Sequence, residues 1–246
     1  MLSHADPVLM SPRASTSMNR GRLAGLCYLG VFLAGFVYIA SIPHVGLVGN
    51  DVDAASAHIV SDQAAFWVGY ASFLVSIALR LILMLLFFEM FKPVNERLSQ
   101  LAVYFNITAT SVQAVVALLL LAPIVLLTGE RFTDSFPPTQ LEALAATLLR
   151  LGYYAYTIGL VFFAGYDLLI GYLALRSTFL PRTVGVLMMI TGLGWLTFIA
   201  PSVASRLLPI NLIAGVAGEA VMIAWLLLRG VDEDRWIEAA AARSTG

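Results

Sequence analysis

Six apolar runs divide the chain, and each is long enough to cross a lipid bilayer. A helix needs about 20 consecutive apolar residues to cross a hydrocarbon core that is about 30 Å thick. Every backbone N–H and C=O group needs a partner inside the protein there, and a continuous apolar run meets this need as a helix. The sequence therefore predicts an all-α polytopic membrane protein, a bundle of six transmembrane helices. The predicted spans cover residues 23–42, 65–91, 98–127, 150–175, 184–203 and 210–228.

The composition agrees with a chain that is surrounded by lipid. Hydrophobic residues make up 60% of the chain and charged residues 12%, against roughly 45–50% and 25% in soluble domains. A net charge of −1 and the lack of a basic stripe exclude nucleic acid as a partner. Cys27 is the single cysteine, which excludes an intramolecular disulfide bond and a cysteine zinc cluster. The predicted partner is the lipid bilayer, with other membrane protein subunits or a small ligand as further candidates.

Polar segments precede and follow the apolar part of the chain. Residues 1–19 contain proline and serine without periodicity and are predicted to form a disordered cytoplasmic tail. A transmembrane domain is predicted over residues 20–231, and a second cytoplasmic tail over residues 232–246. We expect this single domain to hold all six spans.

Three local signals refine the connections between spans. Residues 43–64 are polar and are predicted to form a loop. Pro123 lies inside the third apolar run and predicts a kink there. Thr139 and Glu142 have the three-residue spacing of a capping box, which predicts the start of a helix. We expect this helix, over residues 139–149, to lie along the membrane interface before the fourth span.

The basic residues predict the orientation of the protein. Lysine and arginine are retained in cytoplasmic loops. With the N-terminus inside, ten of the 14 basic residues lie in cytoplasmic segments, three lie outside and Arg80 is inside a span. Both termini are therefore predicted to be cytoplasmic, in a multi-pass protein of the cell (inner or plasma) membrane. The ten are Arg13, Arg20, Arg22, Lys92, Arg97, Arg176, Arg182, Arg229, Arg235 and Arg243.

Polar residues near the centres of the spans form the candidate binding site. A charged side chain at the bilayer centre costs at least about 2.5–3.5 kcal/mol, so each of these residues must face protein or water. Small and polar residues lie beside them at helical spacing, which is typical of faces that pack on other helices. We therefore predict that these residues converge on a central polar cluster, which consists of Arg80, Gln113, Tyr156, Asp167 and Glu219.

Two interpretations of the charged members remain open. We hypothesise that Arg80 is held by Asp167, by Glu219 or by both. One cation between two acids leaves a spare negative charge, which a proton or a cationic ligand would balance. The alternative is a buried ion pair that fixes the register of the helices, because buried pairs often have architectural roles.

Polar residues near the ends of the spans give weaker signals. His44 and His58, with Asp51 and Asp53, are candidate metal ligands in an outer loop, but their spacing matches no recognised site. Ordinary loop residues are therefore favoured, and no metal is predicted. Glu89 is near the inner end of the second span, where it is predicted to reach the lipid headgroups or Lys92.

Catalytic signatures are missing from the sequence. It has no GxSxG, HExxH or Walker motif. Its three histidines, His4, His44 and His58, all lie outside the spans. This excludes an intramembrane histidine relay and a haem with two histidine ligands. No catalytic residue and no cofactor is predicted, and an enzyme is not favoured.

Several short motifs carry a resemblance to a known family. They begin with residues 22–26 and Tyr28 in the first span, and end with Gly218-Glu219, Trp225 and Gly230. With these motifs the chain, over residues 20–231, resembles the bacterial membrane-protein family catalogued as domain of unknown function 4386. The resemblance implies a multi-span membrane protein and no assigned chemistry. Between these motifs lie Lys92-Pro93-Val94-Asn95, residues 159–163, Gly171-Tyr172-Leu173, Arg176-Ser177 and Leu180-Pro181-Arg182.

The sequence leaves three classes of function. It favours a non-catalytic subunit or an assembly component of a membrane complex. The alternative is a small-molecule or proton-linked binding or transport protein that uses the central polar cluster. A membrane enzyme that acts on lipid or isoprenoid is favoured least, since no nucleophile or metal motif supports it.

Overall fold

The computed structural model describes residues 14–43, 51–129 and 135–244, and these residues are almost entirely helical. No β-strand occurs among them. A short 3-10 helix, η2 (Thr197–Ile199), follows α8. The α-helices are α1 (Ala14–Ser41), α2 (Val52–Ser61), α3 (Gln63–Phe91), α4 (Glu96–Leu120), α5 (Ala122–Leu127), α7 (Pro138–Arg176), α8 (Arg182–Leu196), α9 (Pro201–Leu228) and α10 (Glu233–Ser244).

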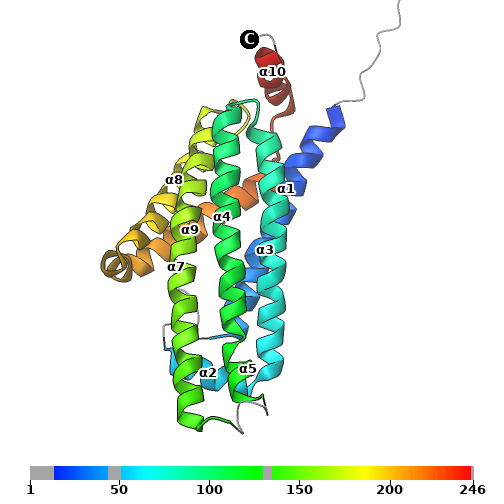
Figure 1. The fold of residues 1–246 in the computed structure, drawn as a ribbon. Coiled ribbons are helices and arrows are strands. Elements are labelled where there is room, and N and C mark those ends of the chain that lie inside the picture. Colours follow the sequence, from blue (N-terminus) through cyan, green and yellow to red (C-terminus); the bar gives the residue numbers. More distant parts are fainter. Residues whose placement is uncertain (1–13, 44–50, 130–134, 245–246) are drawn as a thin grey trace, which may run out of the picture.

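Six helical segments of the described chain are long and apolar enough to cross a membrane, which confirms the predicted fold class. α3, α4 and α7 run nearly parallel, α1, α8 and α9 are inclined to them, and the bundle has α10 at one end and α2 at the other (Figure 1). We call these the α10 end and the α2 end. The segments are Arg20–Ser41, Gln63–Phe91, Glu96–Leu127, Pro138–Arg176, Arg182–Ile199 and Pro201–Leu228.

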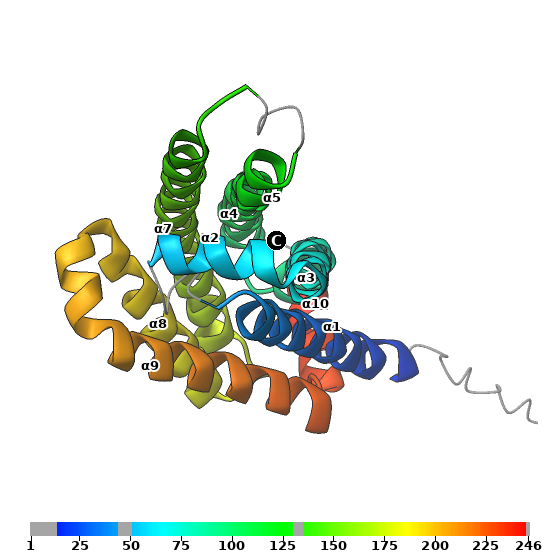
Figure 2. The same ribbon diagram turned by 90° about the horizontal axis from the view of Figure 1, so that it is seen from below.

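The spans form a closed ring. Each packs against the next in the order α1, α3, α4, α7, α8 and α9, and α9 returns to pack against α1 (Figure 2). Large side chains from four of these helices fill the middle of the ring: Tyr28, Phe87, Ile170 and Met222 are each at most 2% exposed. The ring therefore has a packed apolar core, and any polar group that faces inward is surrounded by it.

The third span is broken near Pro123, as predicted. α4 ends at Leu120 and α5 begins at Ala122, with Pro123 in the first turn of the new helix. Proline lacks the backbone N–H that a helix needs, and it disfavours helical geometry in the residue before it. The first turn of a new helix tolerates both effects, because its N–H groups have no partner within the helix.

The predicted interfacial helix over residues 139–149 is not a separate element. These residues are the first part of α7, which runs without a break for 39 residues. Leu141, Ala145 and Leu149 recur every four residues and are at most 4% exposed, packed against α5 and α2. Because this stripe continues the buried face of the fourth span, the helix has no reason to turn along the interface.

The predicted capping box is also wrong. α7 is preceded by Pro137 as its N-cap, and no side chain accepts a hydrogen bond there. Pro138 occupies the first turn instead, which begins the helix because its fixed φ angle suits that position. Thr139 is thus already inside the helix, where its side chain is in the wrong place to cap it.

The polar segment over residues 43–64 is not only a loop, because it contains α2. Asp51 caps this helix: its Oδ1 atom accepts a hydrogen bond from Ala54 N at 3.0 Å. Val52, Ala55 and Ile59 are at most 6% exposed and anchor the helix on the bundle. In Figure 2, α2 crosses the end of the ring. These apolar residues recur at intervals of three and four and form one buried stripe, which is enough to make this mostly polar segment a packed helix.

The first helix begins earlier than predicted. α1 starts at Ala14, so the last residues of the predicted disordered tail are helical. Residues 1–13 lie outside the described part of the chain. The predicted second tail, residues 232–246, contains α10.

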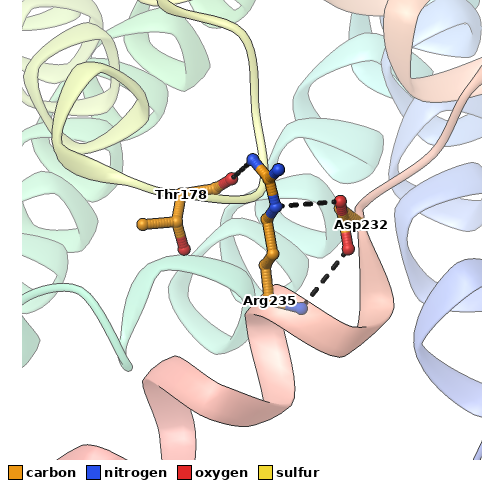
Figure 3. Close-up of polar contacts among 3 residues, drawn as sticks. All are labelled: Thr178, Asp232 and Arg235. Atoms are coloured by element: carbon orange, nitrogen blue, oxygen red, sulfur yellow. Dashed lines mark hydrogen bonds and ion pairs between the residues drawn. The ribbon is translucent and has the colours of Figure 1, made fainter.

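Two hydrogen bonds hold α10 against the bundle. Gly230 has a φ angle of 70° and allows the sharp turn after α9. Arg235 Nε lies 3.3 Å from Asp232 Oδ2, and its Nη1 donates to the carbonyl oxygen of Thr178 at 3.1 Å (Figure 3). The indole Nε1 of Trp236 donates to the carbonyl oxygen of Met90 at 3.0 Å. The helix is thereby tied to the α7–α8 turn and to the end of α3.

Replacing Trp236 with phenylalanine is expected to loosen α10 without unfolding the ring. The change keeps an aromatic ring but leaves the carbonyl of Met90 without its indole donor, at a cost of about 1 kcal/mol. Hydrogen exchange of the α10 amides is expected to rise by about fivefold. Trp67→Phe is the matched control, since Trp67 is 47% exposed and lies near the start of α3, at the opposite end of that helix from α10. Equal exchange in both variants would contradict the anchoring role.

Candidate functional site

The three charged residues of the predicted cluster lie at one depth in the bundle. Arg80 is on α3, Asp167 on α7 and Glu219 on α9. Each of these helices ends at the α10 end. At a rise of about 1.5 Å per residue, Arg80 lies about 17 Å before the end of α3 and the two acids about 14 Å before the ends of theirs. Three helices therefore bring two acids and one base into the same region of the bundle, where their charges act on one another.

The charges influence one another without forming a direct ion pair. Both Glu219 and Asp167 act electrostatically on the Arg80 guanidinium. Within the described residues, however, no nitrogen of Arg80 lies within 4.0 Å of either carboxylate. The guanidinium instead lies over the ring of Phe163, 4.3 Å from its centroid. The predicted holding of Arg80 by an acid is thus not a contact ion pair in this structure.

Burial differs among the three charges. Asp167 is 3% exposed, whereas Arg80 and Glu219 are only partly buried. A cation over an aromatic face is stabilised by the ring quadrupole, by about 2 kcal/mol when it is desolvated. Phe163 therefore offsets part of the cost of placing Arg80 here, and the two carboxylates are left without a contact cation.

Two tyrosines that sequence reasoning missed belong to the same region. Tyr28 on α1 and Tyr166 on α7 are 1% and 2% exposed. Both interact electrostatically with Arg80, Asp167 and Glu219. The hydroxyl oxygen of Tyr166 is buried without a hydrogen-bond partner. A tyrosine inside an apolar run is indistinguishable from a core aromatic residue, although the position of Tyr166 next to Asp167 was a usable signal.

The remaining predicted members lie further from the α10 end. Tyr156 is about 30 Å before the end of α7, and Gln113 about 26 Å after the start of α4. Tyr156 interacts electrostatically with Arg80 and Glu219. Gln113 is 6% exposed, and its Oε1 atom has no hydrogen-bond partner. Tyr156 is therefore at the margin of the charged group, while Gln113 is a separate buried amide.

The candidate metal ligands at the α2 end do not form a metal site among the residues that the structure describes. Asp51 caps α2, and His44 lies outside the described residues. Among the residues that the structure describes, no three histidine, cysteine, aspartate or glutamate side chains gather as metal ligands would. Asp53 instead lines a cavity of about 540 Å³ between α2 and α7, together with Glu142.

The cavities that can be described lie at the two ends of the bundle. At the α2 end, a second cavity of about 280 Å³ shares Asp53 and adds Arg150. At the α10 end, one of about 290 Å³ is lined by α1, α3 and α10. Another, of about 480 Å³, lies beside the α7–α8 turn and the start of α10. The linings of these four cavities are separate from the charged group.

The comparisons with known proteins give a family. Neither a curated protein nor a solved structure matches this chain. A family profile described as Domain of unknown function (DUF4386) matches residues 23–230, which is most of the chain and all six apolar helices apart from short end segments. The resemblance seen in the sequence motifs is thereby confirmed: the chain belongs to the family of proteins that contain this domain of unknown function.

Proposed function

We propose that this protein is a membrane-embedded binding or transport protein for protons or small cations. Its site consists of Arg80, Asp167 and Glu219, with Tyr28 and Tyr166 beside them. The observation that carries the proposal is the imbalance of charge: two acids and one base share one depth, and neither acid contacts the base within 4.0 Å.

A purely architectural role fits this arrangement less well. An ion pair that fixes helix register works through contact, since its attraction must offset the loss of hydration of both ions. Here the guanidinium packs on Phe163 instead, 4.3 Å from the ring centroid. An intramembrane ionisable residue that lacks a contact partner is a functional-site hypothesis by default. Asp167 and Glu219 thus remain available to bind a proton or a cation.

The charge balance suggests how the site works. With one positive and two negative groups, the fully ionised site carries one excess negative charge in a medium of low dielectric constant. A bound proton or a small cation removes that excess, and Arg80 keeps the second acid ionised. Gain and loss of the cation would then change the net charge of the core by one unit, which is the elementary step of a proton- or cation-linked carrier.

The orientation is part of the proposal. The ends of α3, α7 and α9 and the starts of α4 and α8 carry basic residues at the α10 end, such as Lys92, Arg97 and Arg182. By the positive-inside rule we infer that this end faces the cytoplasm of the cell membrane. A reporter fused to the C-terminus that is active only in the cytoplasm tests this; an inactive fusion would reverse it.

A flux measurement tests the site. The protein is reconstituted in liposomes that contain a trapped pH indicator, and a pH gradient is applied. Wild type is expected to dissipate the gradient, and Asp167→Asn and Glu219→Gln are each expected to slow dissipation by at least about tenfold, because each removes a proton-binding group. Asp53→Asn, an exposed acid at the α2 end, is the matched control.

Native mass spectrometry of gently extracted protein tests whether the site binds a cation other than the proton. A reproducible bound mass below about 1 kDa, lost in Asp167→Asn or Glu219→Gln but kept in Asp53→Asn, supports the proposal. If wild type neither dissipates the pH gradient nor retains such a mass, the proposal is wrong.

A non-catalytic subunit of a membrane complex is the second candidate. It is favoured by the exposed apolar side chains of η2 and α9, where Ile199 is 68% and Ile213 is 71% exposed. Lipid covers such side chains equally well, so exposure alone does not rank it first. Stoichiometric co-purification of a heavier membrane protein in the same mass spectra would favour this candidate.

A further inference from the structure

We propose that the cavity between α1, α3 and α10 binds the headgroup of a phospholipid that carries a primary ammonium group, such as phosphatidylethanolamine. The cavity has a volume of about 290 Å³, and its polar lining residues are Arg20, Glu89 and Trp236. It is separate from the charged group in the core, so the two proposals fail independently.

The position of the cavity matches the depth of lipid headgroups. Arg20 begins the first span, and Glu89 lies two residues before the end of the second. Trp236 is in α10, just beyond the end of the bundle. Tryptophan, arginine and other polar residues gather at this level because the membrane is apolar on one side of it and hydrated on the other.

The apolar wall of the cavity continues onto the outer surface of the spans. Leu23 on α1 is 53% exposed and Leu85 on α3 is 58% exposed, and both line the cavity. An acyl chain can therefore follow these side chains while its headgroup stays in the cavity. A soluble ligand would gain nothing from this continuity, which identifies a lipid as the occupant.

The charges of the cavity select the headgroup. Arg20 and Glu89 line the same cavity, yet no ion pair within 4.0 Å joins them in the described part of the chain. A phosphate group suits Arg20, because guanidinium N–H groups match phosphate oxygens. An ammonium group suits Glu89, because a charge-assisted hydrogen bond to a carboxylate is stronger than a neutral one. One headgroup that carries both charges satisfies both side chains.

Trp236 contributes shape rather than a polar contact. Its indole N–H is already donated to the carbonyl oxygen of Met90 at 3.0 Å. The ring therefore forms a fixed apolar part of the cavity wall. This also explains why α10 is tied to the end of α3: without that contact the cavity loses one side.

The test compares three lipids with identical acyl chains on the purified full-length protein. Phosphatidylethanolamine, phosphatidylcholine and phosphatidylglycerol are added in turn, and bound lipids are counted by native mass spectrometry. We expect phosphatidylethanolamine to bind about fivefold more tightly than phosphatidylcholine, whose quaternary ammonium cannot donate a hydrogen bond. Phosphatidylglycerol should bind weakest, since Glu89 repels its net charge.

Variants assign the effect to the cavity. Glu89→Gln is expected to bring the affinity ratio of phosphatidylethanolamine to phosphatidylcholine close to one. Arg20→Gln is expected to weaken all three lipids by about fivefold, because each carries the phosphate. Arg22→Gln and Glu238→Gln are the matched controls, since both residues are exposed and lie outside the cavity lining.

A second measurement keeps the test valid if a variant is unstable. Bromine atoms on the upper acyl chain should quench the tryptophan fluorescence of the wild-type protein more when phosphatidylethanolamine carries them than when phosphatidylcholine does, because Trp236 lines the cavity. Equal affinity of wild type for all three lipids, tightest binding of phosphatidylglycerol, or equal effects of the control variants would each overturn the proposal.

Discussion

Replacing Gly185 with leucine is expected to be among the most destabilising substitutions in the chain. A Cβ atom at Gly185 would lie 2.7 Å from the carbonyl oxygen of Gly171 and 2.8 Å from the backbone nitrogen of Leu175. Both neighbours are backbone atoms of α7, which cannot rotate away as a side chain can. We expect the free energy of unfolding to fall by about 3 kcal/mol.

The close approach of α7 and α8 involves a glycine on each helix, so a side chain at either position would clash. A Cβ atom at Gly171 would in turn lie 2.8 Å from the carbonyl oxygen of Gly185. Paired glycines allow two helix backbones to meet, and van der Waals contact between them replaces the hydrophobic drive that is lacking in lipid. Leucine at either position would force α7 and α8 apart and open the ring on that side.

Gly35→Leu is the matched control, because a Cβ atom there meets nothing within 4 Å. It adds the same side chain to a span and is expected to change stability by less than about 0.5 kcal/mol. Unfolding in mixed detergent micelles, followed by circular dichroism, measures both. If Gly185→Leu is as stable as Gly35→Leu, the α7–α8 contact is not as close as described.

Arg80→Leu is expected to have the second large effect. It leaves Asp167 and Glu219 at one depth with no cation to act on them, and removal of one partner of buried charges typically costs about 3–5 kcal/mol. Since no contact ion pair is lost here, we expect the lower end, about 3 kcal/mol. Neutralising an acid in the same protein, as in Arg80→Leu with Asp167→Asn, should recover part of the loss.

A double-mutant cycle measures this coupling. The coupling energy of Arg80 with Asp167, and separately with Glu219, is expected to be at least about 1 kcal/mol, the size found for residues in one network. Gln113→Leu provides the control and should be additive with Arg80→Leu, because Gln113 is a buried amide outside the charged group. Additive effects for the acids as well would show that the three charges do not form one site.

The two largest expected effects concern different properties of the ring. Gly185 reports how closely neighbouring spans approach, whereas Arg80 reports what the ring encloses. A protein with an intact α7–α8 contact and no coupling at Arg80 would be a membrane scaffold, as a subunit requires. Coupling at Arg80 together with proton flux that depends on Asp167 and Glu219 would make it a carrier.

Sequence reasoning succeeded where structure depends on local interactions. In a bilayer every helical N–H must bond to a carbonyl four residues earlier, so length and apolarity are enough to predict six helices. The break at Pro123 is local for the same reason, since one missing N–H and one steric clash decide it. The charged residues were recognisable as candidates because a charge in an apolar run is costly wherever its helix points.

Tertiary structure decided which of those candidates meet. Arg80, Asp167 and Glu219 share a depth because α3, α7 and α9 enter one ring, and Tyr28 and Tyr166 join them only once that ring closes. Gln113 had the same sequence signal but lies elsewhere, and α2 and the long start of α7 depend on each other's apolar stripes. The face that a helix turns toward the core depends on the helices that pack against it, and those helices are distant in sequence.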